Sequence, residues 1–285
     1  MNITVASGGL GPPLRDATNN ELKLRILSAL VLGPIVLAAI FVGSPYFEIV
    51  MIVSGITMAW EWDRMCGDQK FGPGGIVACA ALFGIGLAVW FNRFDLALIM
   101  IGAATLIGYA VVRLSGKGRP VWASASVIVI GVPCLAAIWL RSDPEIGLRI
   151  TIWLVGAIWA TDVGGYVVGR TVGGAKLAPR ISPGKTWSGL GGGVSMAAIW
   201  GFAWAFCSSA PVPWVICLLG AVTAVVAQCG DLSVSFVKRH FGLKDASNLI
   251  PGHGGVLDRF DGLLSTAPVI ALFVYVTHGG MDLWR

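Results

Sequence analysis

Long apolar segments recur along the whole chain, and they constrain its fold more than any other feature. The chain has 285 residues, of which 56% are hydrophobic and only 12% are charged. A helix of about 20 apolar residues crosses the ~30 Å hydrocarbon core of a membrane, and about nine segments approach that length. They are residues 26–43, 47–62, 75–92, 95–112, 121–140, 150–169, 189–208, 212–229 and 262–278.

Helices are the only reasonable structure for these segments. We find none of the stretches of about ten residues with alternating polarity that barrel strands require. Lipid offers no hydrogen-bond partners to the backbone, whereas a helix forms its backbone hydrogen bonds internally. We therefore predict an all-α polytopic integral membrane protein with about nine transmembrane helices.

A single membrane domain is expected after a short polar tail. Residues 1–21 are rich in Gly, Pro, Thr and Asn and predict a mobile tail that lacks the pattern of a signal peptide. Residues 22–285 are expected to form one helical domain, with 22–149 as its N-terminal helices and 150–285 as its second part. The six cysteines are scattered without a CxxC pair, which is typical of packing residues rather than of a metal site or disulfides.

The distribution of basic residues predicts an orientation. With nine crossings, the side that holds the N-terminus carries sixteen of the 20 Lys and Arg residues, and the other side carries four. Because cytoplasmic loops are enriched in Lys and Arg, we place the N-terminus and segments 170–188 and 230–261 in the cytoplasm. The C-terminus would lie outside the cytoplasmic (inner) membrane. The net charge of +5 follows from these membrane-flanking residues and needs no nucleic-acid partner.

Residues 231–261 gather charge in a chain that has little of it. The segment holds four carboxylates, four Lys or Arg residues and two of the three histidines. Carboxylates bind Mg²⁺, cations bind phosphate, and the glycines beside His253 let backbone N–H groups approach an anion. If a helix begins near Asp258, this residue and Asp261 share one face. The pattern predicts a metal-dependent phosphate site, with a plain solvated loop as the alternative.

A second polar segment, residues 176–189, is basic and carries several hydroxyl groups. Its run GKT at 184–186 resembles the end of a P-loop, but Pro179 stands where that pattern requires glycine, and we expect no strand before it. We therefore reject a Walker-type nucleotide site. The segment is still suited to binding a phosphate chain. The alternative is a basic loop that Trp187 anchors at the membrane interface.

Asp162 is a carboxylate inside an apolar segment. It lies about seven residues, or roughly 10 Å, from the predicted cytoplasmic end. A charge at that depth is costly and predicts a functional role, with a structural hydrogen bond as the alternative. Gly164, Gly165 and Gly169 favour close helix packing beside it. Five other polar residues are expected at the membrane interface: Glu48, Glu61, Asp63, His240 and His278.

The polar residues of the C-terminal half resemble the signature of a known family. The phosphatidate cytidylyltransferases, also called CDP-diacylglycerol synthases, have a signature that is similar to the run Ser235-x-x-Lys238-Arg239-x₄-Lys244-Asp245-x₅-Pro251-x-His253-Gly254-Gly255-x-x-Asp258-Arg259-x-Asp261. The surroundings of Asp162 and Lys185 also resemble the family, so the resemblance covers residues of about 150–285. The chain departs from it at Gly184 and Ser188, where the family usually has a lysine and an acid.

This resemblance implies a reaction and a set of roles. CTP and phosphatidic acid would give CDP-diacylglycerol and pyrophosphate, with Mg²⁺, in a homodimer whose catalytic part is residues 150–285. Asp231 and Asp258 would be the metal ligands, and a second cation is left open. The other expected catalytic residues are Lys238, Arg239, Asp261 and His253. The expected substrate-binding residues are Ser182, Lys185, Thr186, Lys244, Arg259 and Asp162.

Two other functions fit parts of the sequence. A CTP-dependent lipid-alcohol kinase on a related scaffold would release CDP instead of pyrophosphate. A transporter or lipid flippase would place its site near the bilayer midplane, often between repeated halves. Here the charge gathers at one face and we find no repeat, which favours an enzyme.

Overall fold

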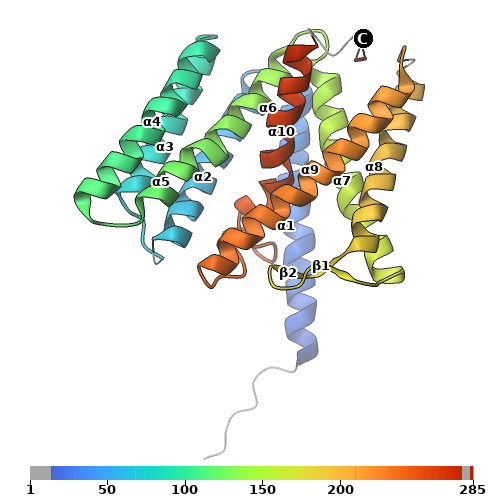
Figure 1. Ribbon diagram of the computed structural model, residues 1–285, viewed down its shortest axis with the longest axis horizontal. Coiled ribbons are helices and arrows are strands. Elements are labelled where there is room, and N and C mark those ends of the chain that lie inside the picture. The colour runs from blue at the N-terminus through green and yellow to red at the C-terminus, as the bar shows by residue number, and fades with distance from the viewer. Residues whose placement is uncertain (1–13, 68, 209, 278–282, 285) are drawn as a thin grey trace, which may run out of the picture.

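A computed structural model describes residues 14–67, 69–208, 210–277 and 283–284, and most of them are helical (Figure 1). The helical elements are α1 (Leu14–Val42), α2 (Tyr46–Cys66), α3 (Pro73–Trp90), α4 (Phe94–Ser115), α5 (Pro120–Ser126), the π-helical η1 (Val127–Gly131), α6 (Val132–Ser142), α7 (Gly147–Thr171), α8 (Trp187–Cys207), α9 (Pro213–His240) and α10 (Leu257–Val276). The strands β1 (Lys176–Ala178) and β2 (Ser182–Thr186) form one short antiparallel hairpin. The expected all-α membrane architecture is confirmed, with this hairpin added.

Each predicted apolar segment coincides largely with a helix or a continuous run of helices. Among the described residues, seven segments are long and apolar enough to cross a membrane: α3, α4, the continuous run α5–η1–α6, α7, α8, α9 and α10. The apolar part of α1 is shorter, Ile26–Val42, and α2 carries several charges, among them Glu61 and Asp63. The count of about nine is therefore approximate. Residues 1–13 of the predicted tail lie outside the described residues, and α1 already begins at Leu14.

Proline and glycine mark several helix ends. α3, α5 and α9 begin at Pro73, Pro120 and Pro213. Proline is tolerated there because the first N–H groups of a helix have no partner within it. α4 is followed by Gly116, whose φ of 65° is left-handed and ends the helix at little steric cost. These ends follow from local chemistry alone.

Helix α8 contacts both α7 and α9 through glycines. A Cβ atom added to Gly164 of α7 would lie 2.5 Å from the carbonyl oxygen of Gly192 in α8, and one added to Gly220 of α9 would overlap the carbonyl of Ala197 in α8. A larger residue does not fit, so the backbones themselves are in contact. The close packing predicted beside Asp162 is confirmed.

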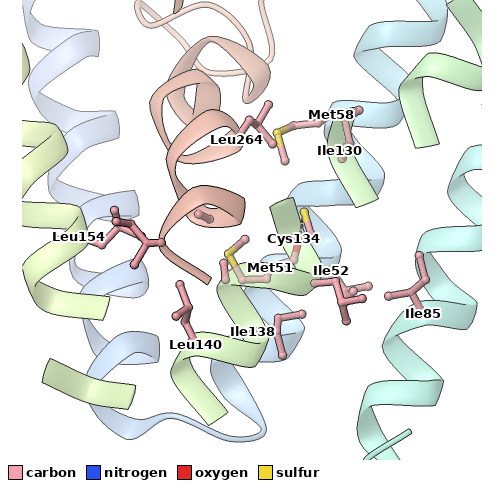
Figure 2. Packing of buried hydrophobic residues seen from close by; sticks show 14 of the residues in the cluster. Met51, Ile52, Met58, Ile85, Ile130, Cys134, Ile138, Leu140, Leu154 and Leu264 are labelled. Atoms are coloured by element: carbon pink, nitrogen blue, oxygen red, sulfur yellow. Dashed lines mark hydrogen bonds between the residues drawn. The ribbon is translucent and has the colours of Figure 1, made fainter. Parts of the chain in front are cut away.

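A buried hydrophobic cluster joins the N-terminal helices to the C-terminal ones. Figure 2 shows Met58 of α2 beside Leu264 of α10, with Ile130 of η1 on the other side. Met58 and Ile130 are completely buried. Lipid is as apolar as these side chains, so the cluster stabilises the fold by van der Waals packing rather than by removal from water.

The two polar segments lie toward the same end of the helical bundle. Figure 1 shows the hairpin, the C-terminal end of α9 and the N-terminal end of α10 toward the lower end, on the side where α1 begins. The last turn of α10 lies at the opposite end. Alternating helix directions thus bring segments that are far apart in sequence to one end of the membrane domain.

Candidate active site

Helix α9 supplies one group of the site residues. It continues to His240, well beyond the predicted segment 212–229, so Asp231 lies within the helix and not after it. Asp231, Ser235 and Lys238 follow one another at spacings of four and three residues, which place them on one face of the helix. The predicted end of this helix was too early because the apolar run ends near Cys229, whereas the polar residues that follow are still helical.

Helix α10 supplies a second group of site residues. The segment between the two helices is residues 241–256, and α10 begins at Leu257. Asp258 and Asp261 therefore lie in its first two turns, at the spacing that was predicted to share a face. Arg259, next to Asp258, is exposed.

An ion pair joins the hairpin to α9. Lys185 Nζ lies 2.5 Å from Asp231 Oδ2, and it also donates to Gln228 Oε1 at 2.9 Å. Ser235 Oγ donates to the other oxygen of Asp231 at 3.2 Å. The side chains of Lys185 and Asp231 are 17% and 34% exposed, so the pair is partly accessible.

Three carboxylates from three helices lie within electrostatic range of one another. Asp162 of α7 and Asp261 of α10 each interact with Asp231 of α9, and with each other. Lys185 and Arg259 act on Asp162, and Lys238 acts on Asp261. Like charges repel at this range, so the cluster depends on positive charge nearby. The site thus concentrates negative charge with basic residues on its border.

Asp258 is held more completely than Asp231. Lys238 Nζ lies 2.6 Å from Asp258 Oδ1, and the backbone N–H groups of Ala246 and Gly255 both donate to Oδ2 at 3.0 Å. The side chains of Lys238 and Asp258 are only 10% and 6% exposed. This carboxylate therefore closes the 241–256 segment onto the start of α10.

The glycine turn binds carboxylates of the protein itself. Gly254 has a φ of 82°, and a Cβ atom there would lie 3.0 Å from Asp258 Oδ2. Gly255 donates its N–H to the same oxygen. The predicted approach of backbone N–H groups to an anion is therefore present, and in this structure the anion is Asp258.

The hairpin residues have structural contacts of their own. Thr186 caps α8, because its Oγ1 accepts a hydrogen bond from Gly189 N at 3.0 Å. Ser182 lies opposite Ala178 in the strand register. Arg239 Nε donates to the carbonyl of Ile181 at 3.2 Å, which ties the end of α9 to the hairpin. A short strand does precede the GKT run, contrary to expectation, but Pro179 still breaks the Walker pattern.

The remaining predicted residues lie at the edge of the site. Lys244 is exposed on the 241–256 segment. His253 Nδ1 lies 2.7 Å from Ser28 Oγ, which links the turn to α1. His240 packs against the rings of Trp122 and Phe241, at centroid distances of 5.4 and 4.9 Å. His278 lies outside the described residues.

Two residues that bind parts of the site were not predicted to do so from the sequence, Glu61 and Gln228. Gln228 accepts from Lys185 one turn before Asp231. Glu61 of α2 was expected at the interface, but it is completely buried against the start of α10. A charged residue within an apolar segment was the available signal for Glu61, as it was for Asp162.

The donor set fits Mg²⁺ bound partly by the protein. The described residues contain no group of three His, Cys, Asp or Glu side chains arranged to hold a metal by themselves. Mg²⁺ in phosphate-transferring sites usually takes one or two carboxylates from the protein and its other ligands from water and phosphate. Asp231, within range of Asp162 and Asp261, offers carboxylate oxygens of that kind.

Comparison with known proteins identifies sequences similar to this chain. The sequence model of the Cytidylyltransferase family matches residues 23–277. A phosphatidate cytidylyltransferase of Brucella suis is 38% identical over 258 residues, which cover 89% of this chain and 93% of that protein. The enzymes of the same name from Pseudomonas aeruginosa and Bacillus subtilis are 34% and 30% identical, over 91% and 89% of this chain and 99% of each relative.

Proposed function

This chain belongs to the cytidylyltransferase family, and we propose how its residues carry out the reaction for which its relatives are named. It is a nucleotidyltransferase of phospholipid biosynthesis, which transfers CMP from CTP to phosphatidic acid and releases CDP-diacylglycerol and pyrophosphate. The observation that supports this reaction best is the meeting of acidic and basic side chains from α7, β2, α9 and α10 toward one end of a membrane bundle. CTP is soluble in water and phosphatidic acid stays in the bilayer, so a site near the membrane surface can reach both.

The reaction is a substitution at the α-phosphorus of CTP. A phosphate oxygen of phosphatidic acid forms the new P–O bond. The bond from the α-phosphorus to the oxygen that bridges to the β-phosphate breaks, and pyrophosphate leaves with that oxygen. All the reacting groups are anionic, so positioning and charge neutralisation account for most of the catalysis.

The basic residues would supply that neutralisation. Lys185 is partly accessible beside Asp231 and would contact the phosphate chain together with Ser182. Lys244 and Arg259 are exposed at the same end of the domain and would bind the lipid phosphate or the triphosphate. Lys238 and Arg239 would hold the polar end of α9 in place and add positive charge. Thr186 would act mainly by fixing the start of α8.

Mg²⁺ is part of the proposal, with Asp231 and Asp258 as its protein ligands and Asp261 beside them. A bound Mg²⁺ would add positive charge at the phosphate oxygens. Lys238, which donates to Asp258 Oδ1, would add positive charge beside this ligand. The negative charge that Asp162, Asp231 and Asp261 bring together would also favour a second cation.

Orientation and assembly are also proposals. The basic loops support a position in the cytoplasmic membrane with the N-terminus and the active site facing the cytoplasm and the C-terminus outside. A periplasmic reporter enzyme fused after Arg285 should then be active, and a fluorescent protein fused there should be dark. We also propose a homodimer, which the mass of the purified protein after subtraction of bound detergent would test.

Product analysis with the purified protein tests the function directly. The full chain, in detergent micelles containing phosphatidic acid, should convert α-labelled CTP into a labelled lipid and release pyrophosphate in equal amounts. Release of CDP with a phosphorylated lipid would support the kinase instead. Movement of lipid between leaflets without any pyrophosphate would support a transporter.

A further inference from the structure

Glu61 is a buried carboxylate that comes from the N-terminal half of the chain. It lies in α2 and is 0% exposed. The ion pairs formed by the described residues do not include it. A buried charge without compensation is very unfavourable, so its partners must offset the loss of water.

Those partners are the first N–H groups of α10. Val256 N donates to Glu61 Oε1 at 2.9 Å, and Leu257 N donates to Oε2 at 2.7 Å. The first N–H groups of a helix have no partner within it, and the helix dipole favours a negative charge at this end. The N-cap residue of α10 is Val256, whose side chain makes no capping hydrogen bond. Glu61 therefore caps α10 from a helix almost 200 residues earlier.

The same carboxylate also holds the segment before α10. Ser247 Oγ donates to Glu61 Oε1 at 2.6 Å. The adjacent Ala246 N–H donates to Asp258, as does Gly255. Glu61 and Asp258 thus bind neighbouring positions on both sides of the turn, and together they set where α10 begins and in which direction it runs.

Gly255 provides the space that Glu61 occupies. A Cβ atom at this position would lie 2.7 Å from Glu61 Oε1 and 2.9 Å from its Cδ. The flanking backbone on both sides is held by hydrogen bonds, so it has little freedom to move away. The second glycine of the His-Gly-Gly run is therefore matched to a residue on α2.

We propose that Glu61 is a positioning residue for cytidylyl transfer: by capping α10 it places Asp258 and Asp261 relative to Asp231. The inference rests on the proposed function, because it assigns those aspartates to the reaction. Because Glu61 is completely buried, we expect it to act without contacting the substrate. Small displacements of catalytic groups reduce rates strongly, so the effect should fall on kcat rather than on the binding of CTP.

Glu61→Gln tests the proposal with little change of shape. The carboxylate accepts hydrogen bonds from two backbone N–H groups, one on each oxygen. In glutamine an NH₂ group replaces one of these oxygens and cannot accept, so the cap is broken on one side. We expect kcat to fall between about 10- and 100-fold, while the KM for CTP changes by less than about twofold. Amide hydrogen exchange in residues 254–261 should become faster. Glu145→Gln, an exposed glutamate in the loop before α7, is the control and should leave all three quantities unchanged.

Gly255→Ala gives an independent test through a double-mutant cycle. Its Cβ should displace the carboxylate and lower kcat, whereas in a Glu61→Ala background there is no carboxylate to displace and the added loss should be smaller. The proposal would be overturned if both Glu61→Gln and Gly255→Ala lost thermal stability while kcat per folded molecule stayed unchanged. Additive effects on kcat in the double-mutant cycle would also overturn it. Failure of the wild-type chain to make CDP-diacylglycerol would instead overturn the proposed function, and the hydrogen-exchange comparison would still test the cap.

Discussion

The ammonium group of Lys185 lies 2.5 Å from a carboxylate oxygen of Asp231. The two residues come from segments of different character, a short hairpin and a membrane-spanning helix. Their contact places the basic GKT run against the face of α9 that also carries Ser235 and Lys238. The two polar segments of the sequence, 176–189 and 231–261, therefore lie together in one site.

Lys185→Met should lower kcat/KM by at least about 100-fold, because it removes the cation that we propose to bind the phosphate chain of CTP. The change also leaves Asp231 without its counter-ion, although Ser235 still donates to it. The rate of labelled CDP-diacylglycerol formation measures the effect. Lys176→Met, at the exposed first residue of strand β1 in the same hairpin, is the control. Equal activities of the two variants would contradict a role for Lys185 in the site.

Asp258→Asn should reduce both activity and stability. It leaves the ammonium group of Lys238 buried without its counter-charge, and breaking a buried pair in this way costs about 3–5 kcal/mol. Asp231→Asn should reduce activity with a smaller loss of stability, since its pair with Lys185 is more exposed. Thermal unfolding in detergent, measured beside turnover, separates the two effects. Asp95→Asn, in an exposed pair with Arg93, should change neither.

Chelation of divalent cations should stop turnover if Mg²⁺ binds at the carboxylates. EDTA should abolish pyrophosphate release, and an excess of Mg²⁺ should restore it fully. Ca²⁺ should restore it poorly, because its longer bonds and higher coordination number suit this kind of site less well. Undiminished turnover in EDTA would contradict the assignment of Asp231 and Asp258 to a metal.

Gly192→Ala should destabilise the contact between α7 and α8. Its Cβ would overlap the side chain of Val168 and the carbonyl of Gly164, and overpacking of this kind costs about 1–3 kcal/mol. Gly191→Ala, one residue earlier on α8, meets no atom within 4 Å and should be neutral or slightly stabilising. The midpoints of thermal unfolding compare the two. A lower midpoint for Gly191→Ala than for Gly192→Ala would contradict the packing.

The helices and the polar segments were predictable because their signals are local. Apolar runs predict helices wherever lipid cannot satisfy the backbone, and proline marked the starts of α3, α5 and α9. The spacing of Asp258 and Asp261 predicted a shared helix face. The extension of α9 to His240 was missed because its last turns leave the apolar run while remaining helical. The short strand β1 was missed because three residues carry little pattern.

What the sequence determined by itself was the kind of protein and the residues that carry its charge. What only the tertiary structure decided was the partner of each charge. Lys238 pairs with Asp258, and Lys185 pairs with Asp231. Glu61 caps α10 from α2, although the two residues that form the contact are 196 positions apart in the sequence. A carboxylate's partner depends on which helix ends meet in space, and that follows from glycine contacts and buried packing between helices rather than from any local run of residues.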